Sequence, residues 1–349
     1  MNPLPALSAF LLVVAGCAST TEGVPARASY GIVARYAIGG AGGWDYLSVD
    51  EKRHRLYVSR GDHVQIVDVL SGKVVGDLPG TPGVHGIAIA GDLGLGFTSN
   101  GRADSVTVFD LDTLAVIDTV KVTGSNPDAI LYEPFSKRVL TFNGRSANVT
   151  AIDAKTRKVV GTLAVSGKPE FAVSDGRGRV FVNIEDRNSV AVIDMATFTV
   201  AKEWPLGSCD SPTGLAIDRA RDRLFSVCGN ARMIALDARA GSVLQELAIG
   251  AGVDGAEFDS GPGLAFSSNG DGTVTVVKGD DAGRYSVVET VATQARARTL
   301  ALDSATHRIY LPTASFGPAP APTDAQPKPR APMIPDTFVI LVLAPGASR

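Results

Sequence analysis

The stretch VTAIDAKTRKVVGTLAVSGKP, residues 149–169, contains two short alternating apolar runs joined by a polar turn. Runs of this kind, rich in Val, Ile and Thr and bounded by turn residues, predict a pair of antiparallel strands. The chain repeats the pattern as VQIVDVLSGKVVGDLP at 64–79 and as VAVIDMATFTVAKEWPL at 190–206. A unit that recurs in this way predicts a repeat architecture.

The turn aspartate of this unit gives the period of the repeat. It recurs at steps of 42, 43, 41 and 43 residues. An Asx side chain at a hairpin turn is expected to accept hydrogen bonds from the backbone that follows it. The five aspartates are Asp68, Asp110, Asp153, Asp194 and Asp237.

A second motif, upstream of each aspartate, gives the number of units. It occurs seven times, and another apolar run precedes each copy, so each unit supplies four short strands in about 42 residues. The copies are RLYVS (55–59), LGFTSN (95–100), RVLTFN (138–143), RVFVN (179–183), RLFSVC (223–228), LAFSSN (264–269) and RIYLPT (308–313).

The two ends of the chain complete one unit between them. The seventh unit has only three strands, the last being FVILVLAP at 338–345, while YGIVARYAIGG at 30–40 matches a fourth strand. We therefore predict an all-β, seven-bladed β-propeller over residues 29–345, with four-stranded blades and a ring closed by the N-terminal strand. The Pro-rich residues 313–338 form an insertion between the second and third strands of blade seven. It is either a plain surface loop or a lid or partner-docking arm.

The N-terminus predicts export. An apolar run of 11 residues ends in VAGC, which resembles a bacterial lipobox. We expect residues 1–17 to be a signal peptide, Cys17 to be lipidated and residues 18–28 to be a tether. Because Ala18 replaces the aspartate typical of inner-membrane retention, we expect a periplasmic lipoprotein on the outer membrane, attached only through its lipid. The alternative is an ordinary secretory signal, since no Lys or Arg precedes the run.

Export bears on the two remaining cysteines. Cys209 and Cys228 lie 19 residues apart with no CxxC motif, so a structural disulfide is the preferred interpretation.

The net charge of −3 gives no basic face for nucleic acid. The chain also lacks GxSxG, HExxH and P-loop motifs, which excludes the enzyme classes that depend on them.

The strand motifs carry a family resemblance. RLYVS, RVFVN and RLFSVCGN, each followed by a run like VxVID, resemble those of the YVTN-repeat, YncE-like propellers of bacterial envelopes. The resemblance covers residues 29–345 and implies the fold. It implies little about function, because propellers host both binding scaffolds and unrelated enzymes.

Aligning the blades predicts a polar ring at one mouth of the central channel. The start of each first strand supplies one residue, and the end of each second strand supplies another. The first set is Asp45, His85, Asp128, Glu170, Thr213, Asp254 and Arg298; the second is Arg60, Asn100, Asn143, Glu185, Cys228, Asn269 and Thr313. We take Trp44, the charged residues of the first set and the three asparagines as candidate ligand-binding residues. Plain channel lining is the alternative.

Two functions follow from this ring. The first is a non-catalytic, monomeric binding protein that holds a peptide, glycan or protein partner at the channel mouth. The second is a metal-assisted lactonase or hydrolase with His85 as base. Carboxylate and amide oxygens suit Ca²⁺ or Mg²⁺, and Glu170 and Asp254 are the candidate metal ligands. Of the two functions, the sequence favours binding over catalysis.

Overall fold

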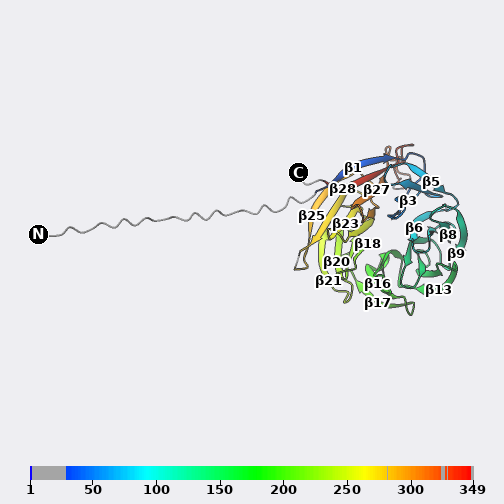
Figure 1. Ribbon diagram of the computed structural model, residues 1–349, viewed down its shortest axis with the longest axis horizontal. Coiled ribbons are helices and arrows are strands. Elements are labelled where there is room, and N and C mark those ends of the chain that lie inside the picture. The colour runs from blue at the N-terminus through cyan, green and yellow to red at the C-terminus, as the bar shows by residue number, and fades with distance from the viewer. Residues whose placement is uncertain (2–28, 281, 324–326, 328, 347–349) are drawn as a thin grey trace.

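The computed structural model describes residues 1, 29–280, 282–323, 327 and 329–346. Its strands form seven four-stranded antiparallel sheets arranged in a ring, which confirms the predicted all-β, seven-bladed propeller (Figure 1). Residues 2–28, which include Cys17 and the expected tether and all but the first residue of the expected signal peptide, lie outside the described residues.

The strands follow the repeat along the chain, and each sheet takes four of them. In chain order they are β1 (Tyr30–Ala37), β2 (Leu47–Asp50), β3 (Arg55–Ser59), β4 (Val64–Asp68), β5 (Val74–Leu78), β6 (Val84–Ala90), β7 (Leu95–Asn100), β8 (Ser105–Asp110), β9 (Val116–Lys121), β10 (Pro127–Glu133), β11 (Arg138–Asn143), β12 (Asn148–Asp153), β13 (Lys158–Ala164), β14 (Pro169–Ser174), β15 (Arg179–Ile184), β16 (Ser189–Asp194), β17 (Thr199–Pro205), β18 (Pro212–Asp218), β19 (Arg223–Cys228), β20 (Arg232–Asp237), β21 (Val243–Ala248), β22 (Gly255–Asp259), β23 (Leu264–Asn269), β24 (Thr273–Gly279), β25 (Tyr285–Ala292), β26 (Ala301–Asp303), β27 (Arg308–Thr313) and β28 (Val339–Pro345).

Blade seven is built from both ends of the chain. Its strand order is β1-β28-β27-β26, whereas the other six blades use consecutive strands. β1 pairs antiparallel with β28 from Tyr30 opposite Pro345 to Ala37 opposite Val339. The blue strand β1 therefore lies beside the red strand β28 in Figure 1, and this pairing closes the ring. Closure leaves no unpaired blade edge at the seam.

Burial explains why the four strands of a blade differ in sequence. The second and third strands are almost entirely buried, as in β11 and β12, so they read as continuous apolar runs. The outer strand has one exposed face, and β13 alternates along its whole length. The third position of each second-strand motif supplies one fully buried large side chain per blade: Tyr57, Phe97, Leu140, Phe181, Phe225, Phe266 and Tyr310.

The repeated aspartates are turn residues, as expected. The Oδ1 atom of Asp68 accepts a hydrogen bond from the Ser71 backbone N–H at 2.7 Å, and Asp153 does the same with Thr156. These bonds stabilise the ionised carboxylate and lower the pKa of both aspartates. The only helix among the described residues is the 3₁₀ turn η1 (Glu185–Arg187), and no described helix has the length and apolarity needed to cross a membrane.

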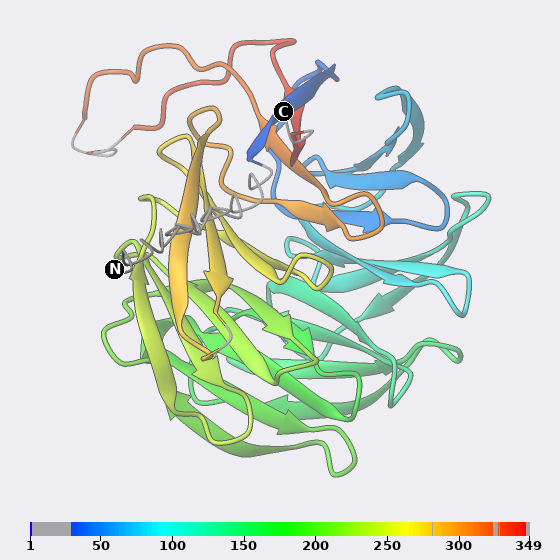
Figure 2. The same ribbon diagram turned by 60° about the vertical axis from the view of Figure 1, so that its left-hand side comes forward.

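The Pro-rich segment lies between β27 and β28 and projects from the body of the propeller (Figure 2). Its root is a short antiparallel ladder in which the Gly317 N–H donates to Pro332 O at 2.9 Å and the Ile334 N–H donates to Ser315 O at 2.8 Å. The ladder fixes where the segment leaves the propeller, on the same face as the predicted polar ring.

Candidate functional site

The ring residues at the channel mouth are held by hydrogen bonds between neighbouring blades. Ser99 of β7 donates to the backbone carbonyl of Asp128 in the next blade at 2.5 Å. Ser268 of β23 donates to Arg298 O at 2.5 Å, and Thr299 donates to Asp45 O at 2.9 Å. Residues far apart in the sequence therefore have fixed backbone positions on one rim.

Asp45, His85 and Asp128 form a compact cluster across blades one, two and three. His85 Nδ1 lies 2.6 Å from Asp45 Oδ2 and 3.5 Å from Asp128 Oδ1. One potential ligand atom from each residue lies within 4.8 Å of the others, and all three side chains are half-buried. The mutual distances suit a single metal ion, so these three residues are the candidate ligands.

The electrostatics of the cluster favour a positive charge. Burial opposes protonation of His85, but the hydrogen bond to Asp45 and the charges of Asp128, Asp45 and Glu170 outweigh it and raise the His85 pKa above 6.5. Burial also raises the pKa of Asp128, with a further contribution from Asp45. A proton on His85 therefore lies between the carboxylates of Asp45 and Asp128. The same two carboxylates would stabilise a bound cation.

A second group lies further round the ring. Lys168 forms a salt bridge with Glu170 at 2.5 Å and a second, very short one with Glu185. Burial and the charge of Asp128 nevertheless outweigh Lys168 and raise the Glu170 pKa to about 8. The sequence alignment missed Lys168, which lies two positions before the ring residue of its blade. In the sequence, only its position between Gly167 and Pro169, in the loop that enters the strand, indicates that Lys168 lies near the ring.

Asp254 also has a cationic partner within the protein. Arg298 Nε lies 3.3 Å from Asp254 Oδ2, although the Arg298 side chain is 57% exposed. Burial, with the charges of Asp45 and Asp128, raises the Asp254 pKa to about 7 despite this partner. Glu170 and Asp254, the metal ligands expected from the sequence, therefore each contact a basic residue. Neither belongs to the cluster of Asp45, His85 and Asp128.

The three asparagines do not face the channel mouth. Asn100 is fully buried, and its Nδ2 donates to Thr107 Oγ1 at 2.9 Å while its Oδ1 accepts from Thr98 at 2.8 Å. Asn143 and Asn269 are also fully buried and make equivalent bonds within their own blades. The motif asparagine thus cross-links the second and third strands, and the expectation that these amides flank a ligand is corrected.

An aromatic residue, Tyr46, follows Asp45 and lines the cavity formed by the first strands. Tyr46 is buried and packs against Phe171 with a centroid distance of 5.2 Å. Burial, together with Asp128 and Asp254, raises its pKa well above 10. The cavity has a volume of about 320 Å³ and contains Glu257, whose pKa burial raises to about 7.

Trp44 and Arg60 both contact the root of the Pro-rich segment. The Trp44 ring lies 5.1 Å from Phe338 and 6.0 Å from Phe316. The Arg60 guanidinium stacks on Phe338 at 3.6 Å and is fully buried, and burial lowers its pKa to about 10. Arg60 is thus a packing residue, whereas Trp44 keeps part of its surface exposed next to Asp45.

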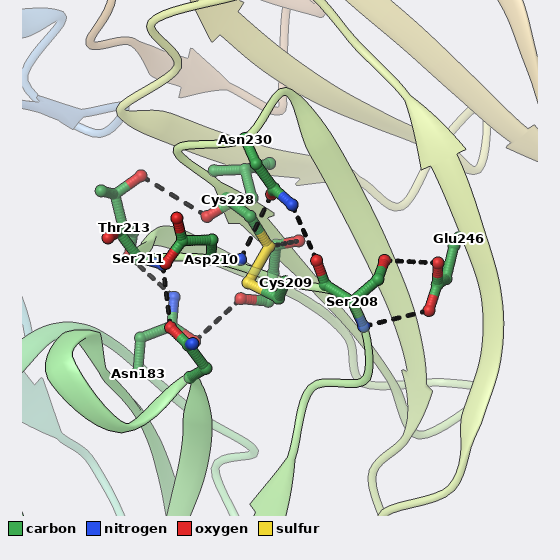
Figure 3. The surroundings of a disulfide bond; sticks show 12 residues. Asn183, Ser208, Cys209, Asp210, Ser211, Thr213, Cys228, Asn230 and Glu246 are labelled. Carbon is green, nitrogen blue, oxygen red and sulfur yellow. Dashed lines mark hydrogen bonds between the residues drawn. A yellow bond between two sulfur atoms is a disulfide. The ribbon is translucent and has the colours of Figure 1, made fainter.

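Blade five carries a disulfide at the position where three other blades carry the motif asparagine. Cys209 and Cys228 are bonded, with their Cα atoms 5.5 Å apart, which confirms the predicted pairing (Figure 3). The loop is also held by Ser208, which donates to Glu246, and by Asn230, whose Nδ2 donates to Ser208 O at 2.7 Å. The bridge fixes the loop that enters β18, and with it one sector of the rim.

Comparison with known proteins supports the architecture only. No protein-family model matches the chain, and no curated protein matches it. Among solved structures, it is similar to a chain of hydrazine synthase from Kuenenia stuttgartiensis, with a TM-score of 0.69 and 18% sequence identity over 77% of this chain and 92% of that chain. Similarity at this level of identity shows the shared fold and no shared function.

Proposed function

We propose that this chain is an exported, non-catalytic binding protein of the cell envelope whose channel mouth holds a divalent cation through Asp45, His85 and Asp128. The single observation that carries the proposal is the distance of 4.8 Å or less between the potential ligand atoms of these three side chains. Three protein ligands leave coordination positions open, so the bound ion is available to a ligand at the mouth.

The donor set indicates which ion fits. An imidazole nitrogen with two carboxylates suits Zn²⁺ or Mn²⁺ better than Ca²⁺ or Mg²⁺, which prefer oxygen ligands. The surrounding charges support a cation, because burial and the nearby carboxylates together raise the pKa values of Asp128, Glu170 and Asp254. The ion would neutralise a site whose carboxylates otherwise repel one another.

Membership of the YVTN-repeat, YncE-like propellers and export to the periplasm are parts of the same proposal. They rest on the strand motifs and on the apolar run that ends at Cys17. Lipidation of Cys17 would hold the propeller at the outer membrane. We expect a monomer that needs no nucleic acid and binds a protein, peptide or glycan at the rim.

Thermal unfolding tests the proposal. A ligand that binds only the folded state raises the midpoint by mass action, so Zn²⁺ or Mn²⁺ should raise the Tm of the metal-free protein. Asp45→Asn should abolish most of the shift. Asp118→Asn is the matched control, because Asp118 lies on the outer strand β9 of blade two and pairs with Arg157 at 3.2 Å. A shift that survives Asp45→Asn would contradict the proposal.

A metal-assisted hydrolase is the second candidate function. The observation in its favour is the 2.6 Å contact between His85 and Asp45, since a carboxylate that orients an imidazole is a frequent arrangement for a general base. A screen of lactones and esters with the metal-loaded protein distinguishes the two functions. Turnover lost on His85→Gln would favour the hydrolase, and its absence favours binding.

A further inference from the structure

A small pocket opens directly beside the candidate cation cluster, between the tops of blades one and two. It has a volume of about 320 Å³, and Asp45 and His85 of the cluster form part of its wall. This volume is at the lower end of the range for small-molecule sites, about 300–1,000 Å³. The pocket is therefore sized for a ligand of one ring, and such a ligand would meet any ion held by the cluster.

Glycine residues in the wall leave the pocket free of side chains on that side. A Cβ atom added at Gly43 or at Gly61 would meet no other atom within 4 Å, so both positions border open space. Gly61 has a φ of 79°, which favours glycine, whereas Gly43 has no positive φ. Gly43 lines the pocket and has both the room and the backbone conformation for a larger side chain, so its substitution tests the pocket.

Two further side chains give the pocket its chemistry. Trp44 forms one wall, and its contacts with Phe316 and Phe338 hold the indole in place. Arg102 forms another wall, and its Nη2 donates to Gly61 O at 3.2 Å, which fixes the guanidinium at the rim. The pocket therefore offers an aromatic surface, a cation-binding cluster and a fixed guanidinium within one small volume.

We infer that this pocket binds one ring of an acidic sugar, of the hexuronate class. The apolar C–H face of the sugar packs on Trp44, its carboxylate pairs with Arg102, and its hydroxyl oxygens complete the coordination of the ion at Asp45 and His85. This inference rests on the proposed cation site. Without the ion, the pocket beside Asp45 and His85 would be acidic and would repel an acidic sugar. It goes beyond that site by naming the ligand class.

Trp44 also provides the readout. The chain has two tryptophans, and the other, Trp204, is buried in blade four against Phe181. Glucuronate added to the Zn²⁺-loaded protein should therefore change the fluorescence of Trp44 in a saturable way, and glucose should bind at least tenfold more weakly. Trp44→Phe should remove the signal.

Two glycine variants, one in the pocket and one outside it, test whether the pocket binds the sugar. Gly43→Leu should weaken glucuronate binding at least tenfold, while Gly91→Leu, at another open glycine in an exposed turn, should stay within twofold of the wild type. Both variants should bind Zn²⁺ as the wild type does. Zn²⁺ binding without glucuronate binding would overturn the sugar site alone, and the absence of both would overturn the cation site as well. Unchanged glucuronate affinity in Gly43→Leu, or glucose binding as tight as glucuronate, would also refute the inference.

Discussion

Glu170 offers a direct test of the electrostatics of the channel mouth. Its pKa is raised from 4.5 to about 8, because burial and the charge of Asp128 outweigh the salt bridge to Lys168. A carboxyl group whose pKa is higher in the folded than in the unfolded state favours folding at low pH, and this benefit is lost as the pH rises toward the folded pKa. Glu170→Gln removes the titrating group and keeps the side-chain shape.

The expected magnitude follows from the two pKa values. Between pH 5 and pH 7 the unfolded chain ionises Glu170 while the folded wild type keeps it protonated, so the wild type should lose roughly 2 to 3 kcal/mol of unfolding free energy relative to the variant. For a propeller of this size, with an unfolding entropy of about 2.1 cal/mol/K per residue, that corresponds to roughly 4 °C in Tm. Glu170→Gln should thus be more stable than the wild type, and the difference should grow with pH.

Calorimetric unfolding in metal-free buffer at the two pH values measures this difference. Glu203→Gln is the control, since Glu203 lies exposed on the outer strand β17, where its carboxylate accepts hydrogen bonds from Ser166 and Ser189. An advantage of Glu170→Gln that is equal at both pH values would refute the reasoning. So would a loss of stability at pH 7, which would mean that the Lys168 salt bridge outweighs burial.

Three further predictions concern the bridge, the cluster and the anchor. Replacing Cys209 and Cys228 together by alanine should lower the free energy of unfolding by about 3 kcal/mol in chemical denaturation, because a loop of 19 residues is no longer closed; an unchanged midpoint would count against this. Gly101→Ala should weaken Zn²⁺ binding in a calorimetric titration, since the new methyl group would lie 2.7 Å from His85 Nε2; wild-type affinity would disprove the orientation of the imidazole. Cys17→Ser should move the full-length protein out of the detergent phase, and unchanged partitioning would exclude the lipid anchor.

The fold was predictable because its signals are local and repeated. Five blades repeat the same Asx turn and all seven repeat a buried second strand, so the period and the number of units could be counted without any tertiary information. The pairing of β1 with β28 followed from the strand that unit seven lacks. The rim position of Asp45, His85 and Asp128 followed from the same alignment.

The partners within the ring were not predictable. The alignment places backbone positions, and it does not show which way a side chain points. Asn100 shares its face with Asp128, yet its amide turns into the blade toward Thr107. Lys168 lies in the loop before β14, outside the aligned positions, and only the fold brings it to Glu185, 17 residues away in the sequence. Side-chain direction and loop residues therefore needed the structure.

The most direct test of the central claim is a calorimetric titration of the metal-free protein with Zn²⁺ at pH 6.5 in two buffers of different ionisation enthalpy. His85 has a raised pKa and must lose its proton to bind a metal. The account predicts saturable binding of one ion per chain with release of up to one proton, and at least tenfold weaker binding for Asp128→Asn. No saturable binding, or equal affinity in Asp128→Asn, would contradict it.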